Sequence, residues 1–109
     1  MIWYRVRDLD SARAFYSGTL GFTVDELNAQ EGWVRLSRGK TVVALTEGEP
    51  DPDSLVAVVD VDDIKGEVAR LRAEQVDVGT ILELHNQVRV VDLFDADGNR
   101  LQLLEDVRR

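Results

Sequence analysis

The sequence of 109 residues contains no cysteine and a single histidine, His85. Without cysteine there can be no disulfide framework, no thiolate zinc site and no cysteine nucleophile. One histidine cannot build a multi-histidine metal centre, and a serine–histidine–aspartate triad would have to use His85. The groups left for metal ligation are therefore carboxylates, amides and one imidazole.

Basic residues and long apolar runs are also scarce. The chain has 13 Lys and Arg against 21 Asp and Glu, which gives a formal net charge of −8. Nucleic acids and anionic membranes attract basic surfaces, so this balance argues against both as partners. No apolar run approaches the roughly 18 residues that span a bilayer, and the N-terminus lacks the pattern of a secretion signal. We therefore expect a cytoplasmic protein, whose excess acid keeps it soluble and also favours a cationic ligand.

The first half of the chain has the pattern β-α-β-β-β. Residues 2–6 alternate between two faces and predict a strand, with Ile2, Tyr4 and Val6 on one face. A helix follows, capped by Asp8 or Asp10 and ended by Gly21. Three further β-type stretches cover residues 22–27, 33–37 and 41–46.

The same order of elements then begins again. A segment rich in acids, with Pro50 and Pro52, interrupts the pattern. The predicted second half contains a strand at 55–61, a helix capped by Asp62 or Asp63, a buried helix stripe of Ile64, Val68 and Leu71, and β candidates at 76–78, 80–84, 88–94 and 100–104. A turn at 95–99 joins the last two candidates.

A shift of 55 residues places Val6–Leu9 on Val61–Ile64, and a shift of 54 places Phe22–Val24 on Val76–Val78. Chance alignment of a few apolar residues is the alternative, but the repeated order of elements favours a duplicated unit. We expect one α+β domain over residues 1–109, with module one at 1–47, a connector at 48–54 and module two at 55–109.

Two segments of this chain resemble the vicinal oxygen chelate superfamily of glyoxalase I, bleomycin resistance proteins and extradiol dioxygenases. The first runs from Val6 to Phe22 and carries DL..A..FY...LGF, and the second, Asp95 to Leu103, carries D.DGN..(E/Q)L. The resemblance covers nearly the whole chain. It implies two tandem β-α-β-β-β modules that form a cupped mixed sheet with the helices on its outer face. It also implies a ligand cavity in the cup, frequently completed across a homodimer.

The resemblance further implies where a metal would be bound, because family members place four ligands, usually histidine or glutamate, on the cup-facing strands. Their positions in this chain are Met1, Ala44, Val56 and Gln102. Ala44 and Val56 have no donor atom, Met1 offers a soft thioether, and Gln102 offers one amide oxygen. We therefore expect no metal and no other cofactor.

Strand alternation from Met1 identifies the other side chains that would line the cup. The predicted pocket is aromatic and polar, and consists of Trp3, Arg5, Trp33, Arg35, Asp60, Asp92 and Gln102. Indole rings stack on flat ligands and attract cations, while carboxylates pair with charged nitrogen. The alternatives are that the tryptophans pack at a dimer interface and that Arg5 forms a cross-strand ion pair with Asp60 or Asp92.

Two other features have simpler interpretations. His85 lies in a polar loop and is expected to be solvated, although Glu83 is close enough in sequence for an acid–base pair. The run Asp95–Asn99 superficially matches a calcium loop, but its glycine comes two residues early and position twelve is Asp106, so a turn is expected.

The leading hypothesis is a metal-independent protein of the glyoxalase/bleomycin-resistance type that sequesters or senses a small organic molecule, with a cationic, ring-containing ligand as the first class to test. The alternative is a superfamily enzyme, a lyase, isomerase or dioxygenase, with an atypical or metal-free active site. That enzyme would use His85, Glu47 or Glu105 as unrecognised ligands, or Asp92 or His85 as acid–base groups. A third hypothesis is an interaction module whose cup is filled by side chains or by a partner subunit.

Overall fold

The structure is a computed structural model that describes residues 1–108. Its first half forms a mixed four-stranded sheet in the order β1-β4-β3-β2, in which β1 and β4 are parallel. The elements are β1 (Ile2–Val6), α1 (Leu9–Ala14), a π-helical turn (Phe15–Thr19), β2 (Thr23–Asn28), β3 (Trp33–Arg38) and β4 (Thr41–Glu47).

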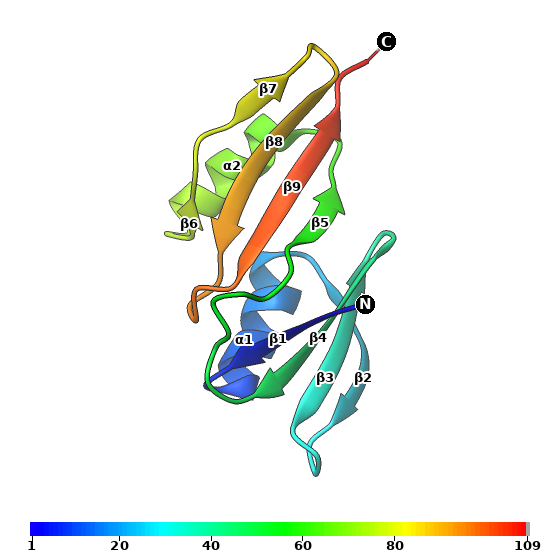
Figure 1. Cartoon of the computed structure of the whole chain (residues 1–109), viewed down its shortest axis with the longest axis vertical. Coiled ribbons are helices and arrows are strands. Elements are labelled where there is room, and N and C mark those ends of the chain that lie inside the picture. The colour runs from blue at the N-terminus through cyan, green and yellow to red at the C-terminus, as the bar shows by residue number, and fades with distance from the viewer. Residues whose placement is uncertain (109) are drawn as a thin grey trace.

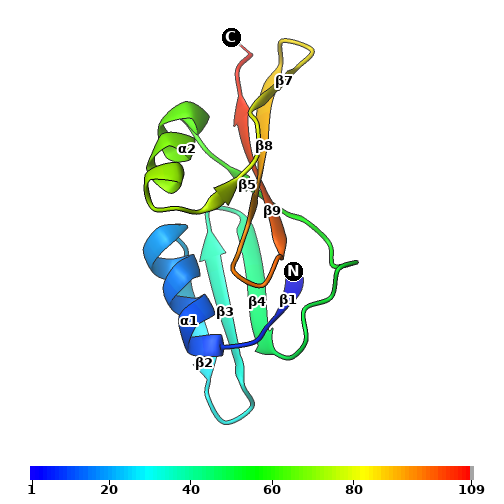
Figure 2. The same cartoon turned by 90° about the vertical axis from the view of Figure 1, so that its left-hand side faces the viewer.

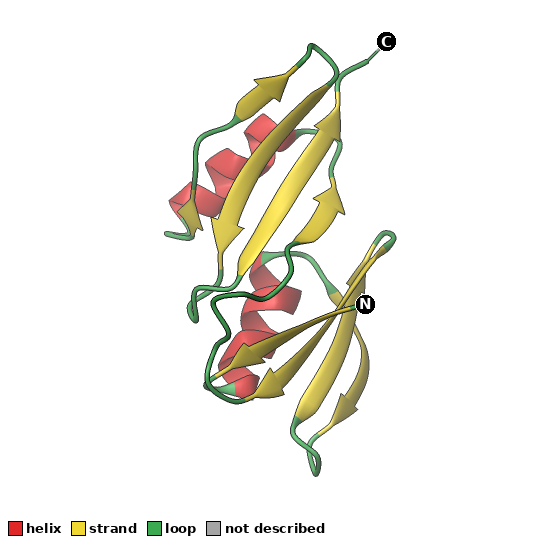
Figure 3. Cartoon of the chain, viewed as in Figure 1, coloured by secondary structure: helices red, strands yellow, loops and turns green. Residues whose placement is uncertain are grey.

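The second half forms a separate mixed sheet in the order β5-β9-β8-β6, with β7 also paired to β8. Its elements are β5 (Ala57–Asp60), α2 (Ile64–Ala73), β6 (Asp77–Val78), β7 (Leu82–Leu84), β8 (Val88–Phe94) and β9 (Arg100–Asp106). The tandem β-α-β-β-β order is confirmed, and each module has its own sheet (Figures 1 and 3).

The two modules lie end to end in a molecule of 47 × 25 × 24 Å (Figure 1). Figure 2 shows α1 and α2 on the same side of the molecule. We call the face of each sheet that lies opposite its helix the open face. Neither helix in the described part of the chain is long and apolar enough to cross a membrane.

The predicted alternation of the strands is confirmed by burial. Tyr4 and Val6 of β1 are fully buried beneath the helices, whereas Trp3 between them is 50% exposed. On β8 Val91 and Leu93 are buried, as predicted, and Val90, which was expected on the cavity side, is buried as well. The α2 stripe of Ile64, Val68 and Leu71 is buried as well, so one apolar layer runs between helices and sheets in both modules.

Two predicted strands are shorter than the sequence suggests. The stretch at 55–61 pairs only over Ala57–Asp60, and Leu55 before it is 73% exposed. The stretch at 80–84 pairs only over Leu82–Leu84. In both cases the residues with high β propensity continue past the last hydrogen-bonded pair. Pairing with β9 limits β5 and pairing with β8 limits β7, so local propensity does not set the strand ends.

The duplication is visible in how each helix begins. Asp8 caps α1 and Asp63 caps α2 by accepting backbone N–H groups of the first turn. A glutamate from the end of the last strand of each module completes the cap. Glu47 accepts from Leu9 N at 3.3 Å, and Glu105 accepts from Ile64 N at 2.8 Å.

The turn Asp95–Asn99 of module two is hydrogen-bonded to module one. Tyr16 Oη donates to Asp95 Oδ2 at 2.8 Å, and Asn99 Nδ2 donates to the Arg5 carbonyl at 3.0 Å. Asp95 is 7% exposed and Asn99 is 2% exposed, so this polar network is buried. Burial and the neighbouring Asp95 raise the pKa of the Tyr16 phenol far above its usual value. The predicted turn is therefore present, and it also forms part of the junction.

A second tyrosine links the same two modules. Tyr4 Oη donates to the Arg100 carbonyl at 2.6 Å and accepts from Ala57 N at 2.9 Å. Both partners belong to the parallel pair β5 and β9, so a residue of β1 is tied to the sheet of module two. Burial raises the pKa of Tyr4 as well, so this phenol remains a donor at ordinary pH.

Candidate functional site

The seven side chains predicted to line the cup lie on the strand positions that alternate with buried core residues. Trp33 and Arg35 flank buried Val34 on β3, and Asp92 and Gln102 alternate with buried leucines on β8 and β9. They form two groups on different sheets, Trp3, Arg5, Trp33 and Arg35 on module one, and Asp60, Asp92 and Gln102 on module two.

The open face of module one carries a pair of tryptophans. The rings of Trp3 and Trp33 meet edge to face, with centroids 6.5 Å apart and an interplanar angle of 68°. Trp33 is oriented further by a hydrogen bond from Nε1 to Glu31 Oε2 at 3.0 Å. Trp3 and Arg35 both stand beside Ala44 in the sheet register, and Ala44 is only 1% exposed. Neighbouring side chains therefore cover the alanine and form a platform.

Charge on this platform is partly neutralised within the module. Arg35 Nη1 lies 3.5 Å from Glu26 Oε1 on the adjacent strand β2. The aliphatic part of Arg5 lies beside Gly48, where an added Cβ would come within 3.4 Å of Arg5 Cδ. Arg5 forms no ion pair with any other residue of 1–108, so its guanidinium is the free positive charge next to the tryptophans.

The open face of module two carries a hollow of about 240 Å³. Gln102 Nε2 donates to Asp92 Oδ1 at 3.2 Å, and Arg100 Nη1 lies 3.5 Å from Asp92 Oδ2. Asp92 and Gln102 line the hollow together with apolar side chains. The lining consists of Gly79, Thr80, Leu82, Val90, Val91, Asp92 and Gln102.

The predicted alternative in which Arg5 pairs with Asp60 or Asp92 is wrong. Asp92 instead pairs with Arg100, which is two residues from Gln102 on the neighbouring strand β9. Sequence reasoning also missed Gly79, Thr80 and Leu82 as lining residues. The only indication in the sequence was that these residues precede the strand predicted at 88–94. Their exact position could not be predicted, because tertiary contacts set the pairing of short strands.

The residues at the four family metal positions do not fit a metal ion. Ala44 is buried and has no donor atom, and Val56 is a hydrocarbon side chain. Met1 is 67% exposed and offers only a thioether, which leaves the amide of Gln102. Within residues 1–108 no three His, Asp or Glu side chains are grouped so as to hold an ion.

The other candidate ligands are engaged or dispersed. Glu47 and Glu105 cap α1 and α2, and Glu105 also lies 3.3 Å from Arg89. His85 is exposed in the β7–β8 turn with a positive φ of 55°. Glu83, its suggested acid–base partner, lies 4.0 Å from Arg89 Nε. Among residues 1–108, these groups do not assemble a metal or acid–base centre at another place.

The tandem β-α-β-β-β modules define the class of protein. The chain belongs to the Glyoxalase/Bleomycin resistance protein/Dioxygenase superfamily, whose family model matches residues 1–103. The resemblance seen in the sequence motifs is thereby confirmed. A search of curated proteins found no matching sequence.

Three solved structures illustrate the range of similar proteins. A bleomycin resistance determinant encoded on transposon Tn5 superposes with a TM-score of 0.75 at 23% identity, covering 96% of this chain and 94% of that chain. The antibiotic-binding protein TnmS3 from Streptomyces sp. CB03234 gives 0.72 at 22%, covering 97% and 94%. A lactoylglutathione lyase from Agrobacterium tumefaciens gives 0.73 at 20%, covering 94% and 89%. At these identities the similarity establishes the fold and not the activity.

Proposed function

We propose that this protein binds a small organic molecule without a metal ion and acts by sequestering or sensing it. The observation that carries the proposal is the chemistry of the family metal positions. Ala44 and Val56 remove two donors outright, while the hollow of about 240 Å³ beside Gln102 has the mixed apolar and polar lining of an organic-ligand site. A superfamily fold that keeps its binding face and lacks the metal ligands is suited to binding more than to metal-assisted turnover.

The lining of the hollow defines a ligand with an apolar body and a polar end. Leu82 and Val90 offer hydrocarbon, and Asp92 and Gln102 offer hydrogen-bonding groups. Arg100 Nη1 lies 3.5 Å from Asp92 Oδ2, and the Asp92 side chain is still 35% exposed, so the carboxylate remains accessible to a ligand. A cationic, ring-containing molecule fits this combination, and the bleomycin resistance determinant makes bleomycin the first probe.

A homodimer would bring the tryptophan platform over this hollow. Large apolar side chains remain exposed at both open faces, with Trp3 at 50%, Val58 at 42% and Leu82 at 55%. On the open faces, Arg5 of module one corresponds to Asp60 of module two at the repeat offset of 55, so these two positions carry opposite charges. If module one of one copy faces module two of the other, arginine meets aspartate in both halves of the dimer.

Intrinsic tryptophan fluorescence tests the binding proposal, because both tryptophans of the chain lie on the open face of module one. Titration with metal-free bleomycin should quench the emission saturably. Asp92→Asn, which removes the charge in the hollow, should raise the Kd about tenfold. Asp77→Asn serves as the matched control, since Asp77 lies on β6 outside the hollow.

Two results would count against binding as the function. One is an emission that stays flat up to millimolar bleomycin and cationic aromatic amines. The other is a turnover that depends on added metal and is lost in Gln102→Ala, which would favour the alternative of a superfamily enzyme similar in fold to the lactoylglutathione lyase.

A further inference from the structure

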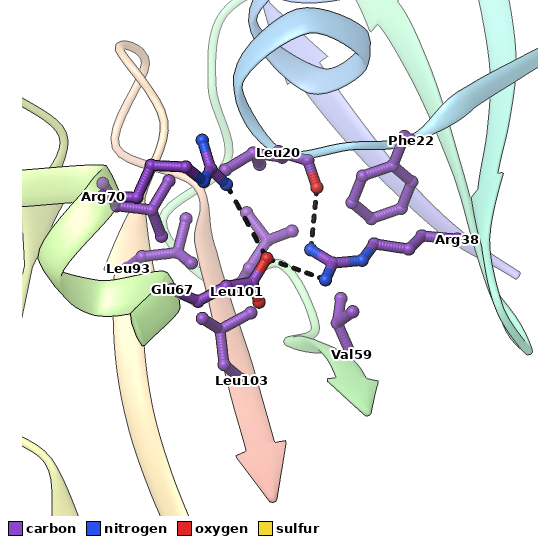
Figure 4. Close-up of a pocket in the computed structure, with 10 residues that line it drawn as sticks. Leu20, Phe22, Arg38, Val59, Glu67, Arg70, Leu93, Leu101 and Leu103 are labelled. Atoms are coloured by element: carbon purple, nitrogen blue, oxygen red, sulfur yellow. Dashed lines mark hydrogen bonds and ion pairs between the residues drawn. The ribbon is translucent and has the colours of Figure 1, made fainter. Parts of the chain in front are cut away.

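An ion-pair cluster joins the modules on the helix side, opposite to the open faces. Arg38, at the end of β3, directs Nη2 to Glu67 Oε1 of α2 at 2.7 Å. Arg70 Nη2, from the next turn of α2, lies 3.7 Å from the same oxygen. Figure 4 shows both guanidinium groups directed at the one carboxylate. Two cations from different modules thus form a clamp for an anion, and Glu67 supplies that anion.

Glu67 fills this clamp incompletely. Its Oε2 is buried and has no hydrogen-bond partner within the described chain. Arg38 uses its other terminal nitrogen, Nη1, for the Leu20 carbonyl at 2.9 Å, so it contacts Glu67 through one nitrogen and not in the two-pronged manner that favours carboxylates. An unpaired buried carboxylate oxygen is unfavourable. A carboxylate that is not tethered to α2 is free to rotate and place both oxygens against Arg38 and Arg70.

The Glu67 head group separates two spaces. On one side is an apolar cavity of about 10 Å³, room for one water-sized sphere, between the modules. Its apolar lining is Leu20, Phe22, Val59, Leu71, Leu93, Leu101 and Leu103. On the other side is an open hollow of about 330 Å³ that shares Arg38, Glu67 and Arg70 with the cavity. Outward rotation of Glu67 would connect the two spaces.

We propose that the module junction is a second ligand site, for a short aliphatic carboxylic acid, and that Glu67 is its built-in occupant. The carboxylate of the ligand replaces that of Glu67 between Arg38 and Arg70, its tail occupies the space that the Glu67 side chain vacates, and only its terminal methyl enters the apolar cavity beside Leu20 and Leu101. Asp62 and Asp63 line the outer hollow, so they disfavour ligands with a second negative charge. The site therefore selects a monoanion with a tail of a few carbons.

This site is independent of the one on the open face. Its lining leucines of β8 and β9 alternate with Asp92 and Gln102, so the two sites lie on opposite faces of the same sheet. Binding at the junction replaces a contact between module one and module two. A ligand there is thus positioned to alter how the modules are held together.

Sodium butyrate is the probe, with butyramide as an uncharged control of the same shape. In the wild-type chain, butyrate should produce saturable amide chemical-shift changes at Leu20, Phe22 and Leu101. Glu67→Ala removes the competing carboxylate and should lower the butyrate Kd about tenfold. Glu67→Gln, which keeps the side-chain volume, should shift the Kd in the same direction, and adding Arg38→Ala to either variant should abolish the gain.

Three outcomes would overturn the proposal. They are wild-type shifts that do not saturate or that map away from the junction, an unchanged Kd in a folded Glu67 variant, and binding of butyramide as tight as that of butyrate. Asp77→Ala, on a residue outside both spaces, is the control for a general effect of lost negative charge.

Discussion

Removing the hydroxyl of Tyr16 should weaken the junction between the modules. The ring is fully buried and Oη donates to Asp95 Oδ2 at 2.8 Å, which leaves only Asn99 Nδ2 on that oxygen when the hydroxyl is deleted. A hydrogen bond to a charged group contributes about 1.5–3 kcal/mol. We expect Tyr16→Phe to lower the free energy of unfolding by about 2 kcal/mol, or the Tm by roughly 8 °C.

The same tyrosine predicts a dependence on alkaline pH. Burial is the main cause that raises the pKa of Tyr16 and of Tyr4 above the usual 10.0, so both keep their protons in the folded chain. The unfolded chain loses these protons as the pH rises through about 10. Stability that is fully present below that pH should therefore fall above it, by about 1.4 kcal/mol per pH unit for Tyr16 and further for Tyr4 until the pH reaches its own raised pKa. Tyr16→Phe should lose one of these two contributions.

Urea unfolding followed by far-UV circular dichroism, at neutral pH and at a series of values above pH 10, measures both effects. Ser17→Ala is the matched control, because Ser17 donates its hydroxyl to the Arg13 carbonyl on the same helical segment and is only partly buried. That control should change the free energy by less than about 0.5 kcal/mol. Equal stability of Tyr16→Phe and the wild type, or parallel alkaline slopes, would refute the assigned role of Tyr16.

Three further variants probe other parts of the molecule. Gln75 follows Glu74, the C-cap of α2, and has a positive φ of 64°, so Gln75→Gly should stabilise the chain by about 0.5–1 kcal/mol in thermal melting, and a lower Tm would contradict this. Glu105→Ala removes the acceptor for Ile64 N and should cost about 1 kcal/mol in urea unfolding; an unchanged midpoint would show that the cap is dispensable. Trp3→Ala removes the Trp3–Trp33 platform and should therefore weaken the self-association that analytical ultracentrifugation measures. A sedimentation profile like that of the wild type would show that the platform is not part of the interface.

Most of the fold could be predicted because the signals are local and repeated. The alternation of Ile2–Val6 and the stripe of Ile64, Val68 and Leu71 each identify one buried face, and the structure buries those faces. The capping aspartates and Gly21, which has a φ of 77°, mark the ends of the first helical segment. Such patterns depend on residues only a few positions apart, so the sequence alone reveals them.

The candidate site was harder to predict from the sequence, because its geometry depends on the pairing of strands that are far apart in the chain. β6 and β7 contain two and three residues, too few for alternation to define a face or a register. Their pairing with β8 brings Gly79, Thr80 and Leu82 to the hollow, and the separate pairing of β8 with β9 places Asp92 near Arg100. The junction has the same character, since Tyr16 and Asp95 are 79 residues apart and nothing local links a turn motif to a buried phenol.

Calorimetric titration of the chain with metal-free bleomycin, in excess EDTA and again with added zinc or iron, tests metal-independent binding most directly. Because the Ala44 and Val56 positions offer no donors, we predict one saturable binding event per chain with the same Kd under all conditions. Binding that appears only when a metal is supplied to the protein, and vanishes in EDTA, would contradict metal-independent recognition.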